Sequence, residues 1–251
     1  MRTEPNELPR VNELRELIDD PRSSNAYFQN FDTSIEEEPL KKKLWIALER
    51  EFERLDKGSW CYLKTEAVPY LVKRDAHGRG WQQLITILNQ ARAHNYLSDI
   101  GCSQVRFVPR EGQTGKRTPD LEGQLDDRRL LCEVKTLNES DVEIGRRQAD
   151  GVGTTTNYLD TGFFAKLRSG LCEARKQMEA HDNSANVQRV AFIVLNFDDS
   201  LAEYRANYYR QIDQHLAENP ISELDIVFYN QWTGFPCNVS MQHAIVINEA
   251  G

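Results

Sequence analysis

The stretch from Thr118 to Leu137 constrains this chain more than any other. Its sequence, TPDLEGQLDDRRLLCEVKTL, predicts a hairpin of two β-strands. The polar segment Gln124–Arg129 is the expected turn, and the second strand is expected over Leu130–Leu137. A hairpin brings its two arms side by side, so side chains of both arms can meet at one end.

Four charged side chains of this hairpin form two pairs, and the members of each pair point to the same face of their strand. Side chains two positions apart on a strand point to the same face, so Asp120 goes with Glu122 and Glu133 goes with Lys135. If the arms pair normally, the two sets converge. Two carboxylates facing one point can hold a divalent cation, because hard cations prefer oxygen ligands. An ammonium group beside them can position a water or hold a phosphate charge.

A purely structural interpretation competes with this one. An acid and a lysine two apart can form an ordinary ion pair, and Pro-Asp is frequent in turns. However, the segment LLCEVKTL is typical of a central strand with both faces buried. Burying an unpaired carboxylate is costly, and a buried ion pair often fails to offset its own desolvation. We therefore favour a functional role for Glu133 and Lys135, while Glu122 is either a further ligand or a solvated edge residue.

The residues Pro119-Asp120 and Glu133-Val134-Lys135 resemble the motif of the PD-(D/E)xK, or restriction-endonuclease-like, nuclease superfamily. The resemblance implies that Asp120 and Glu133 bind Mg²⁺, or Mn²⁺, with the Val134 carbonyl as a third ligand. It implies that Lys135 assists the attacking water, so that Asp120, Glu133 and Lys135 form the catalytic set. The implied substrate is nucleic acid, with DNA preferred to RNA.

The predicted order of elements extends this resemblance to about Trp81–Asn196. Apolar spacing predicts a helix from about Trp81 to Leu97, a strand at Gln104–Val108, the hairpin, a helix at Phe163–His181 and a strand at Arg189–Asn196. The family's core has the order helix, three strands, helix, strand. The expected fold class is therefore α/β (α+β), a restriction-endonuclease-like core with a central mixed sheet flanked by helices.

Further elements are expected outside that core. Residues 1–60 are expected to form an N-terminal helical extension, and residues 61–251 the restriction-endonuclease-like domain. Residues 59–79 are open between short strands and a helix interrupted at Pro69. A helix opened by Ser200 and strands at Asp225–Tyr229 and Ala244–Ile247 are expected near the C-terminus.

The resemblance also suggests accessory residues. The family usually supplies an acid from the helix before the first strand, and Gln83 stands near that place. A Lys or Gln often follows on the next helix, for which Lys166 and Gln177 are the candidates, with plain surface charge as the alternative. Arg146 and Arg147, in the long polar stretch after the hairpin, could clamp a phosphate, because the Arg fork matches phosphate oxygens.

Composition limits the partners. The net charge of −8 disfavours non-specific binding to nucleic acid, which depends on Lys and Arg. The negative charge and the Gln at position 83, where the resemblance implies an acid, favour an alternative. In this alternative the chain has a catalytically weak or inactive nuclease fold that binds nucleic acid or a regulatory partner. The N-terminal helices could then contact a protein partner or a second copy in a homodimer.

The same composition indicates a cytoplasmic protein. No apolar run approaches the ~20 residues that a membrane helix needs, and the N-terminus lacks a secretory signal. The five cysteines are scattered, and none forms a CxxC pair, which disfavours a zinc site or a disulfide framework.

Overall fold

The computed structural model describes residues 8–21, 23–75, 81–109, 118–138, 157–196 and 205–230. The chain forms two compact units, Met1–Phe107 and Val108–Gly251. The sequence placed a domain boundary at residue 60, which lies within a continuous helix of the first unit. None of the described helices is long and apolar enough to cross a lipid bilayer.

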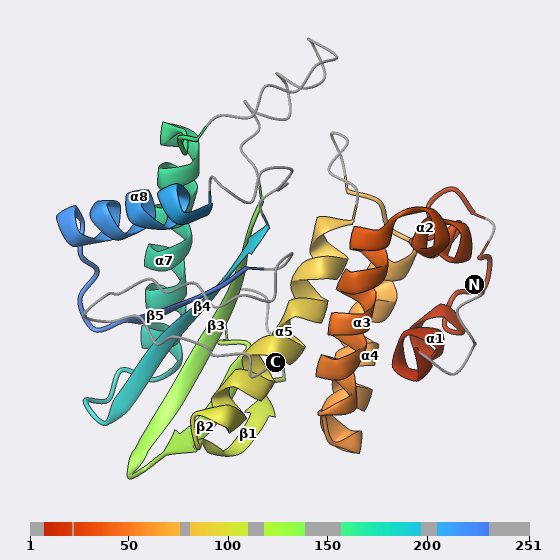
Figure 1. Cartoon of the computed structure of the whole chain (residues 1–251). Helices are drawn as coiled ribbons and strands as arrows, with labels where there is room; N and C mark the ends of the chain where they lie inside the picture. The colour runs from red at the N-terminus through yellow and green to blue at the C-terminus, as the bar shows by residue number, and fades with distance from the viewer. Residues whose placement is uncertain are drawn as a thin grey trace. The chain divides into compact units, whose positions relative to one another are not determined.

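The first unit is mainly helical (Figure 1). Its elements are α1 (Pro9–Arg15), α2 (Phe31–Glu37), α3 (Pro39–Glu53), α4 (Lys57–Leu71), α5 (Gln82–Asp99) and the strand β1 (Ser103–Phe107). α1 and α3 each start with a proline in the first turn, where its missing N–H costs nothing. The helix over Trp81–Leu97 and the strand over Gln104–Val108 are confirmed within one or two residues.

Residues 57–71 form α4, so the first part of the segment that the sequence left open, 59–71, is helical. Residues 76–79 of that segment lie outside the described residues. The Asp56 carboxylate accepts hydrogen bonds from the backbone N–H groups of Gly58 and Ser59, which caps the helix start. Pro69 lies inside the helix, close to its end. The helix buries one stripe, made up of Trp60, Leu63, Ala67 and Leu71.

The second unit is built on a mixed sheet. Its strands are β2 (Leu121–Leu125), β3 (Arg128–Asn138), β4 (Val187–Asn196) and β5 (Asp225–Asn230), and they lie side by side in that order. β2 and β3 are antiparallel, whereas β3–β4 and β4–β5 are parallel. The expected α+β class, with a central mixed sheet flanked by helices, is therefore confirmed.

The hairpin turn is tighter than the sequence suggested. Gln124 pairs with Arg129 and Leu125 with Arg128, so only Asp126 and Asp127 remain between the strands. Asp126 has a φ of 50°, a left-handed conformation that Asp tolerates better than most residues. The predicted six-residue turn was wrong because its polar side chains lie on paired strand positions.

Two helices cover one face of this sheet. α7 (Thr161–His181) connects β3 to β4, and α8 (Arg205–Glu218) precedes β5; both lie on the same side of the sheet in Figure 1. Odd-numbered residues of β3 and β4, such as Leu131, Ala191 and Ile193, share a core cluster with both helices. The apolar stripe of α7 comprises Phe163, Leu167, Leu171, Ala174 and Met178. The face that carries Glu133 is thus the face beneath α7.

Candidate metal and catalytic site on the hairpin

The register of the hairpin places the two candidate carboxylates opposite each other. Leu121 pairs with Cys132, Asp120 comes immediately before Leu121, and Glu133 immediately follows Cys132. Opposite residues of an antiparallel pair project to the same face. A hydrogen bond of 2.9 Å from the backbone N–H of Val134 to Asp120 Oδ2 ties the two arms together at this point.

Glu133 is the buried centre of the cluster. The residue is 3% exposed, and both oxygens of its carboxylate accept hydrogen bonds. Lys135 Nζ donates to Oε1 over 2.7 Å, and Gln177 Nε2 of α7 donates to Oε2 over 2.9 Å. The same amide of Gln177 also donates to the Thr118 carbonyl. Gln177 therefore joins both arms of the hairpin to the helix that covers them.

The electrostatics of Glu133 reflect its burial. Desolvation, followed by the negative charge of Asp120, raises the pKa of Glu133 to about 8. The ammonium of Lys135 and a hydrogen bond from the Asp120 backbone act in the opposite direction but do not cancel these effects. The site thus contains two carboxylates and only one ammonium group, so its negative charge is not fully neutralised. A further cation would stabilise the ionised form of Glu133.

The donor atoms suit a hard cation. Asp120 and Glu133 supply carboxylate oxygens. The backbone of Val134 lies next to the Asp120 side chain, to which its N–H donates a hydrogen bond. Magnesium commonly uses one or two carboxylates and keeps several waters. Across the described residues, no group of three or more Asp, Glu, His or Cys side chains forms a metal site. An ion here would therefore depend on two carboxylates, the Val134 carbonyl and water.

Glu122, which the sequence left open, contacts an arginine. It is 8% exposed, and its Oε2 accepts a 3.2 Å bond from Arg129 Nε and a second bond from Nη2 of the same side chain. Arg129 Nη1 also donates to Asp182 Oδ2 over 2.7 Å. These contacts connect the hairpin to the end of α7. Sequence reasoning missed Arg129 because it lay inside the expected turn.

The remaining candidates lie in different places. α7 passes close to Lys135 at Gly170, where an added Cβ would lie 4.0 Å from Lys135 Cγ, and Lys166 is one turn further towards the start of α7. Gln83 belongs to α5 in the first unit, and its backbone N–H donates to the Asp75 carboxylate over 3.1 Å. Arg146 and Arg147 fall outside the described residues, as does the strand predicted at Ala244–Ile247.

Comparison of the chain with protein-family models, curated proteins and solved structures finds no match. The case for a function therefore depends on the chemistry of the residues themselves. The hairpin offers two oxygen-donor side chains, an adjacent ammonium and an amide that fixes the buried carboxylate. This set can bind a divalent cation and act on a substrate with an anionic reacting group.

Proposed function

We propose that the second unit carries a Mg²⁺-dependent phosphodiesterase site that hydrolyses nucleic acid, with DNA preferred to RNA. One observation carries this proposal. The carboxylate of Glu133 is buried opposite Asp120, and its pKa is raised to about 8 partly by the charge of that neighbour. Lys135 supplies only one positive charge for these two carboxylates, and perturbed carboxylates cluster at functional sites.

Each residue of the cluster has a role in this proposal. Asp120 and Glu133, with the Val134 carbonyl, would hold Mg²⁺ or Mn²⁺. When bound, the ion would polarise the phosphate and neutralise the charge that develops on it. Lys135 would orient the attacking water and stabilise the transition-state charge through its ammonium group. Gln177 would hold the Glu133 carboxylate in position, as outer hydrogen-bond partners do for metal ligands.

The order of elements supports a restriction-endonuclease-like core. An antiparallel hairpin is followed by α7, a crossover helix, and then by β4, which is parallel to β3. The acid–x–lysine pair occupies β3 of that arrangement. This agrees with the family order of strands, helix and strand in which the resemblance first placed the motif.

A second candidate function is binding without turnover. Both oxygens of Glu133 already accept hydrogen bonds from protein donors, Lys135 and Gln177. The net charge is −8, and Gln83 stands near the place where the resemblance implies a helical acid. A nuclease fold with these features would act by binding nucleic acid, or by binding a protein partner or a second copy through the N-terminal helices.

Cleavage assays test the enzymatic proposal. Purified full-length protein is incubated with circular DNA, linear DNA and RNA in the presence of Mg²⁺ or Mn²⁺. We expect cleavage that EDTA abolishes and that Lys135→Ala lowers by about 100-fold or more, the usual effect of removing one group that stabilises transition-state charge. Lys176→Gln, an exposed charge change on α7, should cleave as the wild type does.

Metal titration separates the two candidates. An enzyme should bind Mg²⁺ or Mn²⁺ in calorimetry, and Asp120→Ala should abolish the binding while Glu173→Gln, an exposed acid on α7, leaves it unchanged. A wild type that binds the ion but cleaves no substrate would refute turnover and favour the binding module. A folded wild type that binds neither ion would refute the metal site itself.

A further inference from the structure

Two basic side chains at the end of α4 lie against aromatic rings. The ammonium of Lys73 lies 5.9 Å from the centre of the Tyr70 ring, and the guanidinium carbon of Arg74 lies 5.3 Å from the centre of the Trp81 ring. Lys73 and Arg74 are exposed, whereas both rings are half-buried. These four residues, together with Tyr27, form an aromatic–basic patch that belongs entirely to the first unit.

Backbone and ring contacts hold the patch in place. The backbone N–H of Tyr27 donates to the Leu71 carbonyl over 2.9 Å, so this segment is fixed to the end of α4. The indole N–H of Trp81 donates to the Asn25 carbonyl over 3.2 Å. The Tyr27 ring meets the Trp81 ring edge to face, with 5.3 Å between the ring centres. These rings are therefore in position before a ligand binds, which lowers the entropic cost of binding.

The positive charges of the patch are not paired with acids. The other cations that lie over rings in the described part of the first unit are each bound to a carboxylate, in the pairs Arg10–Glu13, Lys64–Glu13 and Arg15–Asp32. Lys73 and Arg74 form no ion pair with any described residue. Asp75, the next residue, turns its carboxylate inward, because Oδ2 accepts the Gln83 N–H over 3.1 Å and Oδ1 is buried. The patch therefore offers two exposed cations to an anionic ligand.

The chemistry of the patch suits one class of ligand. Guanidinium and ammonium groups bind phosphate oxygens, and aromatic rings and arginine planes stack on nucleic-acid bases. Val72 precedes the two cations in the chain and is 46% exposed, so it offers an apolar contact to a base or a sugar. In a double helix the flat faces of the bases are covered by their neighbours, whereas a single strand can turn them outward. The patch therefore fits a single strand better than a duplex.

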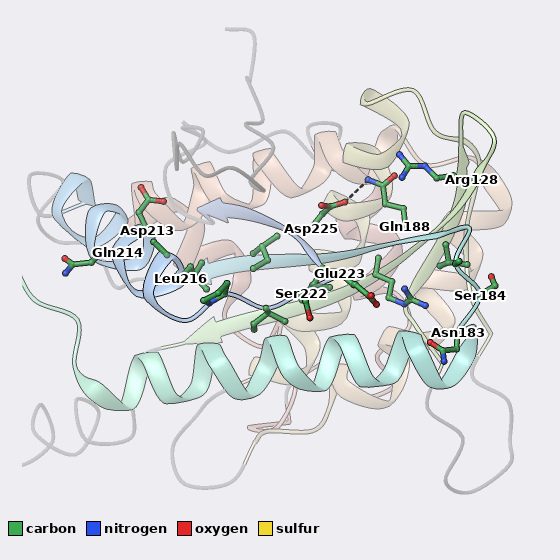
Figure 2. Close-up of a pocket in the computed structure, with 18 of the residues that line it drawn as sticks. Arg128, Asn183, Ser184, Gln188, Asp213, Gln214, Leu216, Ser222, Glu223 and Asp225 are labelled. Atoms are coloured by element: carbon green, nitrogen blue, oxygen red, sulfur yellow. Dashed lines mark hydrogen bonds between the residues drawn. The ribbon is translucent and has the colours of Figure 1, made fainter.

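The large cavity of the second unit lacks this chemistry. It measures about 1470 Å³ and lies among residues of α8, the strands β3, β4 and β5, and the segments before β4 and β5 (Figure 2). No aromatic side chain is among the described residues that line it. Three arginines and three acids are present in the lining: Arg128, Arg189, Arg210, Asp213, Glu223 and Asp225. Its wall thus has no net charge to attract a polyanion, which makes its exposed arginines a suitable control.

We propose that the aromatic–basic patch binds single-stranded nucleic acid. Lys73 and Arg74 donate hydrogen bonds to phosphates, while one base stacks on Tyr70 and the next on the Arg74–Trp81 pair. These contacts reach only the backbone and the ring faces, so binding tolerates any sequence. The inference rests on the proposed function, since it names a single strand as the form of nucleic acid that the protein binds. The patch needs no metal, however, so EDTA separates its binding from the chemistry of the hairpin site.

Fluorescence anisotropy of a labelled oligothymidylate of about 12 nucleotides, titrated with the full chain in EDTA, measures this binding. We expect a dissociation constant on the order of 10–100 μM in about 100 mM salt, within the usual range for sequence-independent binding. Two phosphate contacts on a single strand should give a slope of about −1.4 for the logarithm of the association constant against the logarithm of the salt concentration. A duplex of the same length should bind at least about fivefold more weakly, since its bases cannot stack on the patch. Polyglutamate, which offers negative charge without bases, should not compete.

Variants locate the site. Lys73→Gln and Arg74→Gln should each reduce the magnitude of the salt slope by about 0.7, because each removes one phosphate contact. The double variant should bind at least about tenfold more weakly. Tyr70→Leu keeps an apolar side chain but removes the ring, so it should weaken binding at least about fivefold and leave the salt slope unchanged. The matched control combines Arg128→Gln with Arg210→Gln, which removes the same charge from exposed positions of the cavity wall, and it should bind as the wild type does.

Three results would overturn the proposal. The first is a folded wild type that does not bind the single strand at protein concentrations up to about 1 mM, above the usual range for sequence-independent binding. The second is an affinity that the Lys73→Gln, Arg74→Gln double variant retains, or that falls equally in the cavity control. The third is equal affinity for duplex and single strand with no effect of Tyr70→Leu, which would show that only charge is recognised.

The outcome is independent of the cleavage assays. Metal-dependent cleavage by a wild type that binds no single strand in EDTA would refute the patch and leave the phosphodiesterase proposal standing. Binding in EDTA that depends on Lys73, Arg74 and Tyr70, without cleavage in Mg²⁺ or Mn²⁺, would support the patch and refute turnover at the hairpin.

Discussion

Replacing Glu133 by Gln should stabilise the metal-free protein, and the gain should grow with pH. Glu133 is 3% exposed, and burial with the nearby Asp120 charge raises its pKa from 4.5 to about 8. Below pH 4.5 the group is neutral in the folded and the unfolded protein. As the pH rises towards 8, the unfolded state loses this proton more readily, so the wild type loses stability.

The size of the effect follows from that interval. One pH unit between the two pKa values corresponds to about 1.4 kcal/mol, so the interval from 4.5 to about 8 corresponds to a loss on the order of 5 kcal/mol. Gln keeps the shape and can still accept a hydrogen bond, but Lys135 loses an ionic partner. The Lys135 side chain is 26% exposed and partly solvated, so that loss is about 1 kcal/mol. We expect the free energy of unfolding of Glu133→Gln to exceed that of the wild type by at least about 2 kcal/mol at pH 9.

Urea denaturation followed by far-ultraviolet circular dichroism measures this difference. The two proteins are compared at pH 5, 6, 7, 8 and 9 in EDTA, with Glu173→Gln as an exposed control. The stability gain of Glu133→Gln should rise from pH 5 to about pH 8 and level off by pH 9, while the effect of the control substitution stays constant. If the free energies of unfolding of the wild type and Glu133→Gln changed in parallel with pH, the claim that burial and Asp120 destabilise the ionised carboxylate would be refuted.

Three further predictions concern the same unit. Adding Mg²⁺ at pH 8 should raise the unfolding midpoint of the wild type and leave Asp120→Ala unchanged, because ligand binding to the folded state stabilises it; equal shifts in both would remove Asp120 from the site. Gln177→Ala should lower the free energy of unfolding by about 1–3 kcal/mol, since Glu133 Oε2 and the Thr118 carbonyl lose their shared donor; no change in urea denaturation would contradict this. Arg129→Met should lower the free energy of unfolding by about 2–3 kcal/mol, because the buried Glu122 loses its partner. Arg128→Met, at an exposed position, should lower it by under about 0.5 kcal/mol. Thermal denaturation of both variants measures the difference, and equal losses would contradict this prediction.

The regular elements of the second unit were readable from the sequence. The helix predicted at Phe163–His181 is α7, Thr161–His181, and the strand predicted at Arg189–Asn196 is β4, Val187–Asn196. Both signals are strong because packing on the sheet demands a continuous apolar stripe or run. The alternation of side chains on a strand likewise predicted that Glu133 and Lys135 share a face.

Other features were beyond a local sequence pattern. Residues 59–79 contain Trp60, Tyr62, Val68 and Tyr70, which favour strands, and Pro69, which disfavours a helix. The cap at Asp56 and the buried stripe of α4 outweigh these preferences. The bond between Arg129 and Asp182 joins residues far apart in the chain, and no spacing rule could have found it.

The two-residue turn at Asp126–Asp127 fixes which residues of the two hairpin arms lie opposite each other. Each arm alternates sides, so adding a single residue between Asp120 and Glu133, if the strands stayed continuous, would send one carboxylate through to the far side of the sheet. Adding a pair of residues, one to each arm, would lengthen the ribbon and still return the acids to a common side. Any natural or engineered version of this chain that preserves the constellation should therefore differ in this interval by even numbers of residues, or else carry a bulge that absorbs the odd one.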